Sequence, residues 1–214
     1  MKKYSINSND FLTTTVNAYF HTTFYGYGKT GNPDFLNILK NDFHHNWSAK
    51  NLSDSVEVLE NIVLSDLADI QSINNKNLTV CVVPRSKTIT SYNNNQLLFQ
   101  ETVKKVIRKF PNTKLVDGSG FIERHINTKT THLRRPTVGF INDGSEPYQG
   151  ISKDTCTFDK RIEGKDILLI DDIYTETVGI DEDMIQALFD NGAKSVIFYC
   201  VGKTKKRVSF LIAI

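Results

Sequence analysis

The feature that most constrains the fold is a strand–loop–helix–strand unit late in the chain, whose first strand runs directly into two acids. Residues 166–170 (DILLI) are apolar after the first position, which predicts a strand buried on both faces, and Asp171 and Asp172 follow at once. The pattern then predicts a helix over 181–191, closed by a glycine, and a second buried strand over 195–201 (SVIFYCV). Two such strands joined through a helix are typical of a parallel sheet.

The same alternation of strands and helices begins earlier in the chain. Residues 78–83 (LTVCVV) predict another buried strand. An amphipathic helix is expected over 96–110, where Pro111 stops it, and a short strand over 114–116. The sequence therefore predicts an α/β fold with a doubly wound, mostly parallel sheet.

Upstream of these strands the pattern is different. Asp54 and Glu57 stand three residues apart before an apolar series at helical spacing, which predicts a capping box and a helix over 54–73 with one buried face. A turn-rich stretch follows this helix. We therefore expect two parts, an N-terminal region of residues 1–76 and an α/β core of residues 77–214.

Composition narrows the class of protein. The 214 residues include 26 Lys and Arg against 24 Asp and Glu, and a net charge of +2 argues against a protein that coats nucleic acid or membranes. Cys81, Cys156 and Cys200 lie far apart and predict neither a disulfide framework nor a zinc site. No apolar run approaches the roughly 18 residues of a membrane-spanning helix, and residues 1–10 lack the apolar core of a signal peptide. These features predict a cytoplasmic protein.

The acid pair indicates a ligand site. In an open parallel sheet, ligands bind beyond the carboxyl ends of the strands, which is where Asp171 and Asp172 are expected to lie. Residues 173–180 then form a loop that opens a helix, and the backbone N–H groups at such a junction suit a phosphate. Thr175 and Thr177 add hydroxyl donors. Paired acids beside a phosphate loop predict a sugar phosphate as ligand, whereas the alternative is that the acids only cap the helix or contact solvent.

This segment resembles the phosphoribosylpyrophosphate (PRPP) motif of type I phosphoribosyltransferases, which is four apolar residues, two acids, two mostly apolar residues and a Thr/Gly-rich loop. The resemblance is closest to the ComF-like and amidophosphoribosyltransferase-like branch and covers about residues 78–204. It implies that Asp171 and Asp172 bind the ribose 2′ and 3′ hydroxyls. It also implies that the loop wraps the 5′-phosphate, through Thr175, Glu176, Thr177, Val178 and Gly179.

The loop departs from the family pattern, which typically reads T-T-G-x-T. Thr177 stands at the usual glycine position, and Gly179 stands at the usual final threonine. Glu176 places a negative charge next to the proposed phosphate. These departures favour a second interpretation beside catalysis, in which the same fold binds PRPP or a nucleotide without turning it over.

The resemblance also implies cationic partners for the diphosphate. The short loop after the first core strand contains Arg85, Ser86 and Lys87, which are expected to contact the diphosphate oxygens; the alternative is a solvated basic turn. Residues 124–135 occupy the place of the flexible catalytic loop in the family, and a basic surface hairpin that touches nucleic acid is the alternative there. The catalytic candidates in that stretch are Arg124, His125 and Lys129, and the stretch also carries His132, Arg134 and Arg135.

Taken as a family member, the chain is expected to bind PRPP with Mg²⁺ and to transfer phosphoribose to an unidentified nitrogenous acceptor, releasing pyrophosphate. Mg²⁺ is expected to arrive on the diphosphate, with Asp171 and Asp172 as the nearest acids. Residues 1–76 would form the variable hood that covers the sugar. The alternative is a non-catalytic sensor of PRPP or a nucleotide that regulates a partner. Contact with nucleic acid and assembly as a homodimer stay open.

Overall fold

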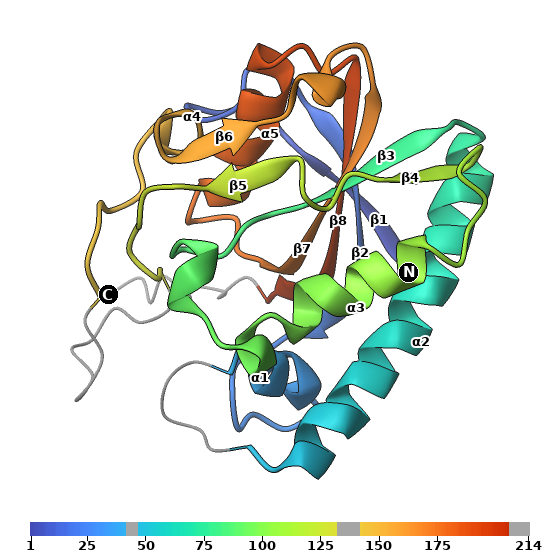
Figure 1. Cartoon of the computed structure of the whole chain (residues 1–214), viewed down its shortest axis with the longest axis vertical. Helices are drawn as coiled ribbons and strands as arrows, with labels where there is room; N and C mark the ends of the chain where they lie inside the picture. Colours follow the sequence, from blue (N-terminus) through green and yellow to red (C-terminus); the bar gives the residue numbers. More distant parts are fainter. Residues whose placement is uncertain (42–46, 132–141, 206–214) are drawn as a thin grey trace, which may run out of the picture.

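The computed structural model describes residues 1–41, 47–131 and 142–205, and its centre is a six-stranded sheet with helices on both faces (Figure 1). The strand order is β1-β2-β8-β7-β3-β4. All neighbouring strands are parallel except β1, which pairs antiparallel with β2. The strands are β1 (Lys2–Ile6), β2 (Val16–Phe24), β3 (Leu78–Val82), β4 (Leu115–Asp117), β7 (Asp166–Tyr174) and β8 (Ser195–Thr204).

The helices and a small second sheet complete the fold. The remaining strands, β5 (Ile122–Arg124) and β6 (Cys156–Phe158), form a separate antiparallel pair. Short 3₁₀ turns cover Ile89–Ser91, Asn94–Gln96 and Lys160–Ile162. The α-helices are α1 (Asp34–Lys40), α2 (Ala49–Asn74), α3 (Leu98–Ile107), α4 (Ile151–Thr155) and α5 (Ile180–Asp190).

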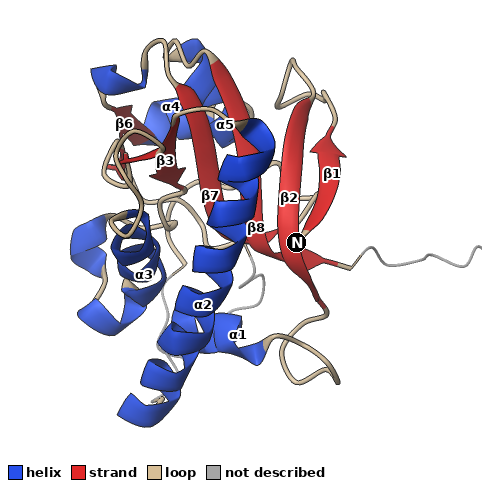
Figure 2. Cartoon of the chain, turned by 90° about the vertical axis from the view of Figure 1, so that its right-hand side faces the viewer, coloured by secondary structure: helices blue, strands red, loops and turns tan. Residues whose placement is uncertain are grey.

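Alternate side chains of β7 enter two different hydrophobic layers. Ile167 and Leu169 pack with α5 on one face of the sheet. Leu168 and Ile170 pack with α1, α2 and α3 on the other face, where the long α2 crosses the strands (Figure 2). All four side chains are fully buried. This burial on both faces explains why the strand is an unbroken apolar run, and it confirms the prediction of a mostly parallel α/β sheet.

Helix α2 begins five residues before the predicted start. Its N-cap is Ser48, whose hydroxyl accepts a hydrogen bond from the Asn51 N–H at 3.1 Å. Asp54 lies inside the helix, where it forms an ion pair with Lys50 at 2.6 Å. The predicted capping box of Asp54 and Glu57 is therefore wrong. A serine followed by alanine and lysine gives no such box, so the true start has a weaker local signal.

Elements on both sides of the expected boundary after residue 76 build one sheet. Strand β2 pairs in parallel with β8, from Ala18 opposite Phe198 to Phe24 opposite Thr204. Helices α1 and α2 supply side chains to the same hydrophobic layer as β3 and β7. The N-terminal residues therefore share both the sheet and the core with residues 77–214.

The connections define a place where the strand order reverses. From β3 the chain passes through α3 to β4 at one edge of the sheet, and it later returns to β7 on the other side of β3. It then continues through α5 to β8, and α3 and α5 lie on opposite faces. Such a reversal is a topological switch point, and ligands of open α/β sheets bind there, beyond the carboxyl ends of the strands.

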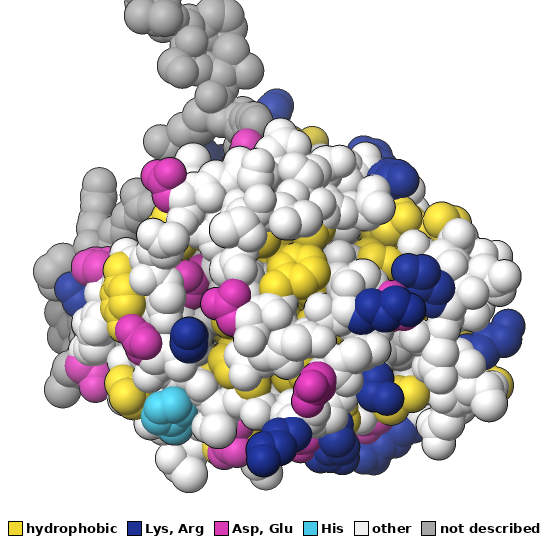
Figure 3. Space-filling model, turned by 90° about the horizontal axis from the view of Figure 1, so that it is seen from above, with side chains coloured by type: hydrophobic (Ala, Val, Ile, Leu, Met, Phe, Trp, Pro, Cys, Tyr) yellow, Lys and Arg dark blue, Asp and Glu magenta, His cyan; other side chains and the backbone are white. Residues whose placement is uncertain are grey.

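The surface seen in Figure 3 carries charges of both signs, as the net charge of +2 predicts. Seen from the top of Figure 1, one face carries both Lys or Arg and Asp or Glu side chains, with hydrophobic side chains between them (Figure 3). The three cysteines are buried and unpaired. None of the described helices combines the length and the apolar character that crossing a membrane requires.

Candidate functional site

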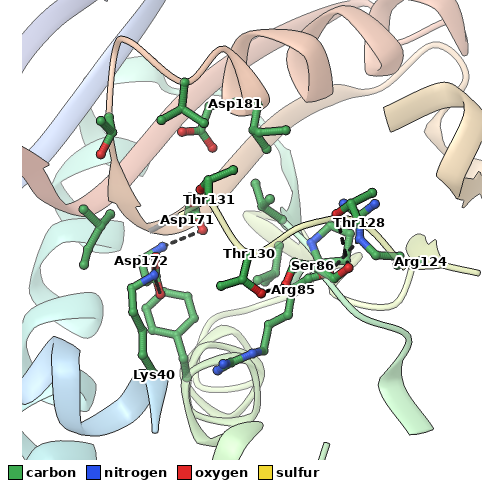
Figure 4. Close-up of a pocket in the computed structure, with 18 of the residues that line it drawn as sticks. Lys40, Arg85, Ser86, Arg124, Thr128, Thr130, Thr131, Asp171, Asp172 and Asp181 are labelled. Atoms are coloured by element: carbon green, nitrogen blue, oxygen red, sulfur yellow. Dashed lines mark hydrogen bonds and ion pairs between the residues drawn. The ribbon is translucent and has the colours of Figure 1, made fainter. Parts of the chain in front are cut away.

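A cavity of about 160 Å³ opens at the switch point between β3 and β7. Its walls come from the loop after β3, from residues 128–131 and from the segment between the end of β7 and the start of α5 (Figure 4). Lys40 of α1 and Phe99 of α3 also line the cavity. The acid pair therefore predicted where the cavity lies. The sequence did not predict that Lys40 of α1 lines it, because α1 lies far from the acid pair along the chain.

The acid pair lies inside β7 and not after it, because the strand continues to Tyr174. The Asp172 N–H donates to Asp171 Oδ1 at 2.8 Å, and both residues line the cavity. Burial, together with the charge of Asp172, raises the pKa of Asp171 to about 7, and Lys40 partly offsets this rise. Asp172 forms an ion pair with Lys40, whose Nζ lies 2.8 Å and 3.0 Å from the two carboxylate oxygens.

A third acid, Asp181, completes the negative side of the cavity. Its side chain is 6% exposed and lines the cavity on the far side of Asp171 from Lys40 (Figure 4). Burial, and then the charges of Asp171 and Glu182, hold the pKa of Asp181 well above its usual range. The Asp181 Oδ1 atom has no hydrogen-bond partner among the described residues. The sequence did not reveal this role, because acids in the first turn of a helix are ordinary partners of the helix dipole.

The loop over 175–179 is a tight turn that leads into α5. The Val178 N–H donates to the Thr175 carbonyl at 3.0 Å, and Thr175 and Val178 line the cavity. Glu176 is exposed and lies 3.9 Å from Lys203, so its charge is turned toward a cation outside the cavity lining. Thr177 and Gly179 do not line the cavity. The loop therefore offers two of its five predicted residues directly to a ligand.

Gly179 explains part of the departure from the family loop. Its φ angle of 78° lies in the left-handed region, and a Cβ atom there would lie 2.8 Å from the Phe11 ring. We expect Gly179→Ala to lower the free energy of unfolding by about 2–3 kcal/mol, measured by denaturant unfolding. Gly164→Ala is the matched control, since Gly164 has a φ angle of 70° and nothing within 4 Å of its Cβ position. Equal losses in both variants would show that Phe11 does not restrict the loop.

Of the three residues after β3 that were predicted to contact the diphosphate, two line the cavity and one does not. Arg85 and Ser86 line the cavity, and the Arg85 guanidinium donates to the Gln96 carbonyl at 2.9 Å. The guanidinium carbon also lies 4.5 Å from the centre of the Tyr92 ring. The Ser86 hydroxyl lies 2.7 Å from that of Thr130, which lines the same cavity.

Lys87 lies away from this cavity, which corrects the expectation that it contacts a ligand there. Its ammonium is buried and forms an ion pair with Asp143 at 2.6 Å. It also donates to the Thr128 carbonyl at 2.9 Å. A buried ammonium needs such partners, so Lys87 fixes the segment that carries Thr128 and leaves no donor for the cavity.

The predicted flexible-loop residues have separate positions. Arg124 ends β5 as a buried side chain that donates to the Arg85 carbonyl at 2.6 Å and to the Thr155 hydroxyl at 2.6 Å, which corrects its assignment to a flexible loop. Lys129 lines the cavity and forms an ion pair with Glu146 at 2.8 Å. His125 is exposed and does not line the cavity, and its ring lies 3.3 Å from the Thr157 hydroxyl. The other predicted members, His132, Arg134 and Arg135, lie outside the described residues.

The site is thus a crevice of opposed charge in an α/β protein, with carboxylates on the β7 side and hydroxyls and cations on the β3 side. Within the described part of the chain, no three His, Cys, Asp or Glu residues are grouped to hold a metal ion. The sequence matches no protein-family model, and no curated protein is similar to it. The function is therefore inferred from the residues that line the crevice.

Proposed function

We propose that the protein has a type I phosphoribosyltransferase fold, binds PRPP with Mg²⁺ and transfers its phosphoribosyl group to a nitrogenous acceptor with release of pyrophosphate. One observation carries this proposal. Asp171, Asp172 and the loop that opens α5 share a single cavity with Arg85 and Ser86, at the switch point of a mostly parallel sheet. The cavity therefore combines acceptors for sugar hydroxyls with donors for phosphate oxygens.

The two ends of the crevice suit the two ends of the ligand. The ribose 2′ and 3′ hydroxyls would donate to Asp171 and Asp172, and hydrogen bonds to charged acceptors are the stronger kind. The 5′-phosphate would lie at the amino end of α5, where N–H groups and the helix dipole favour an anion. Arg85 and Ser86 would donate to the diphosphate across the cavity.

The acids fit Mg²⁺ that is carried by the ligand. Asp171, Asp172 and Asp181 bring three carboxyl groups to one cavity, and carboxylate oxygens are ligands that Mg²⁺ prefers. Mg²⁺ in such sites is held by one or two carboxylates together with phosphates, which does not require three protein ligands. Asp171 and Asp172 would hold it, and its charge would stabilise the leaving diphosphate.

The residues would act mainly by position and charge. The acceptor nitrogen forms a bond to C1 of the ribose while the C1–oxygen bond breaks, and the electron pair of that bond leaves with pyrophosphate. Arg85 and Ser86 would hold the leaving oxygens, and the acids would fix the ring so that C1 faces the acceptor. The acceptor would then lose its extra proton to solvent.

A second candidate is a non-catalytic protein that binds the same ligand. It is favoured by the loop before α5, where Thr177 and Gly179 do not line the cavity and Glu176 faces Lys203. Such a loop would hold the 5′-phosphate with fewer contacts than the family pattern implies. This protein would sense PRPP or a nucleotide and would regulate a partner.

Calorimetry separates these functions. We expect the full chain to bind PRPP in the presence of Mg²⁺, because the cavity pairs hydroxyl acceptors with phosphate donors. Pyrophosphate release across a panel of bases and amines would then identify a transferase and its acceptor, whereas binding without release would identify a sensor. If the protein does not bind PRPP with Mg²⁺, the transferase and the PRPP sensor both fail, and a nucleotide sensor is then tested by titration with nucleotides.

A further inference from the structure

The cation that lies on the proposed ribose site comes from the N-terminal part of the chain. Lys40 is the last residue of α1, and its ammonium bridges both carboxylate oxygens of Asp172 at 2.8 Å and 3.0 Å. Each side chain is about one-fifth exposed, so the pair is accessible from the cavity that both residues line. A ligand hydroxyl that donates to Asp172 must therefore compete with this ammonium.

The other described cations of the cavity are held differently. Arg85 is held by the Gln96 carbonyl and the Tyr92 ring, and Lys129 is held by Glu146. Arg124, which also lines the cavity, is held by the Arg85 carbonyl and the Thr155 hydroxyl. None of these partners belongs to the proposed ribose site. Lys40 differs from these cations because its ion-pair partner, Asp172, is also the proposed acceptor for a ribose hydroxyl.

We propose that Lys40 is a positioning residue that moves from Asp172 to a diphosphate oxygen when PRPP binds, so that the site favours a ribose bearing a diphosphate over ribose 5-phosphate. This inference rests on the proposed function. A lysine suits such an exchange, because its flexible stem carries three donors that need no fixed orientation. The ligand hydroxyls replace the ammonium at Asp172, and the diphosphate supplies the displaced ammonium with a new anionic partner.

The charges around the acid pair agree with this exchange. Lys40 lowers the pKa of Asp171, against the larger rise from burial, and so keeps this carboxyl closer to its ionised form. A ligand without a diphosphate would remove Lys40 from Asp172 and would offer it no anion at C1 of the ribose. A ligand with a diphosphate offers the displaced ammonium a new anionic partner.

The test compares two ligands on Lys40→Met. We expect this variant to bind ribose 5-phosphate about fivefold more tightly than the wild type, because the competitor for Asp172 is gone. We expect it to bind PRPP with Mg²⁺ about tenfold more weakly, because a charge-assisted contact to the diphosphate is lost. Lys40→Arg is expected to retain the preference for PRPP, since it keeps the positive charge.

Lys50→Met is the matched control. Lys50 also forms an ion pair with an aspartate, at 2.6 Å, but its side chain is 82% exposed on α2 and does not line the cavity. This variant is expected to leave both affinities unchanged. Thermal unfolding of each variant shows whether it is folded at the temperature of the titrations.

The outcomes separate this inference from the function on which it rests. A wild type that binds neither ligand overturns the proposed function and the exchange together. If the wild type binds PRPP and Lys40→Met changes both affinities by the same factor, or neither, Lys40 is only a fixed structural partner of Asp172 and the inference fails. Opposite changes for the two ligands are the expected result.

Discussion

Calorimetry on the Asp171→Asn/Asp172→Asn variant is expected to show an affinity for PRPP at least about 100-fold below that of the wild type. Hydrogen bonds to charged groups contribute about 1.5–3 kcal/mol each, and the variant weakens two of them. Asn keeps a carbonyl oxygen at Asp171, so the 2.8 Å hydrogen bond from the Asp172 N–H has an acceptor in the variant. The change therefore removes charge with little change of shape.

The control is Asp10→Asn, which neutralises an exposed acid outside the cavity lining. It is expected to bind PRPP as the wild type does. Unchanged affinity in the Asp171→Asn/Asp172→Asn variant would place the ligand away from β7, and the proposed ribose site would then be wrong.

The second large effect is on stability, because Asp171→Asn should make the protein more stable at pH 8 but not at pH 4. A carboxyl with a higher pKa in the folded protein binds its proton more tightly when folded. The stability that this proton supplies is fully present below the unfolded pKa near 3.8 and is lost as the pH rises to about 7. The difference between variant and wild type at pH 8 is expected to be on the order of 2–4 kcal/mol.

Denaturant unfolding between pH 4 and pH 8 measures this difference. The crowded acid Asp181, whose pKa is raised by burial and by the charge of Asp171, should respond in the same direction when changed to Asn. Asp10→Asn is again the control, because this exposed side chain lies outside the cavity lining. A constant difference between Asp171→Asn and the wild type across the range would contradict the crowding of charge at the site.

The sequence predicted the central strands well because their signal is local. Residues 78–83 and 195–201 are apolar runs, and they form β3 and β8 within one to three residues of the expected ends. Strand β7 was predicted too short, because its last residues include Asp171 and Asp172. Acids inside a strand break the apolar pattern even where the backbone pairing with β8 continues.

The first third of the sheet could not be predicted from the local pattern. Strand β2 (VNAYFHTTF) mixes apolar, polar and aromatic residues, and only the pairing with the distant β8 and the edge strand β1 determines it. The same limit applies to the site. The ion pair of Lys40 with Asp172 joins residues 132 positions apart, and no spacing rule connects them.

The buried acids of α5 show a different limit. A run of three acids at the start of a helix is ordinary on a solvated surface. Here Glu182 accepts a hydrogen bond from the Tyr174 hydroxyl at 2.6 Å, and Asp183 accepts from the Ser152 N–H at 2.7 Å. Asp181 faces the cavity beside them. The burial of these acids comes from packing against distant segments, so composition alone does not reveal it.

The pairing of β2 with β8 also sets an order of events during synthesis. Strands β1 and β2 are made before the other described strands, yet β8, which joins them to the rest of the sheet, is the last of the described strands. Contacts between the two ends of a chain form slowly, because a long loop must close before they contribute. We therefore expect the hairpin of β1 and β2 to form before β8 is available. Until then the edge of β2 that pairs with β8 stays unpaired and can pair with strands of other chains. Lys40 can meet Asp172 only after the chain has been made through β7, so the crevice forms later than the hairpin of β1 and β2.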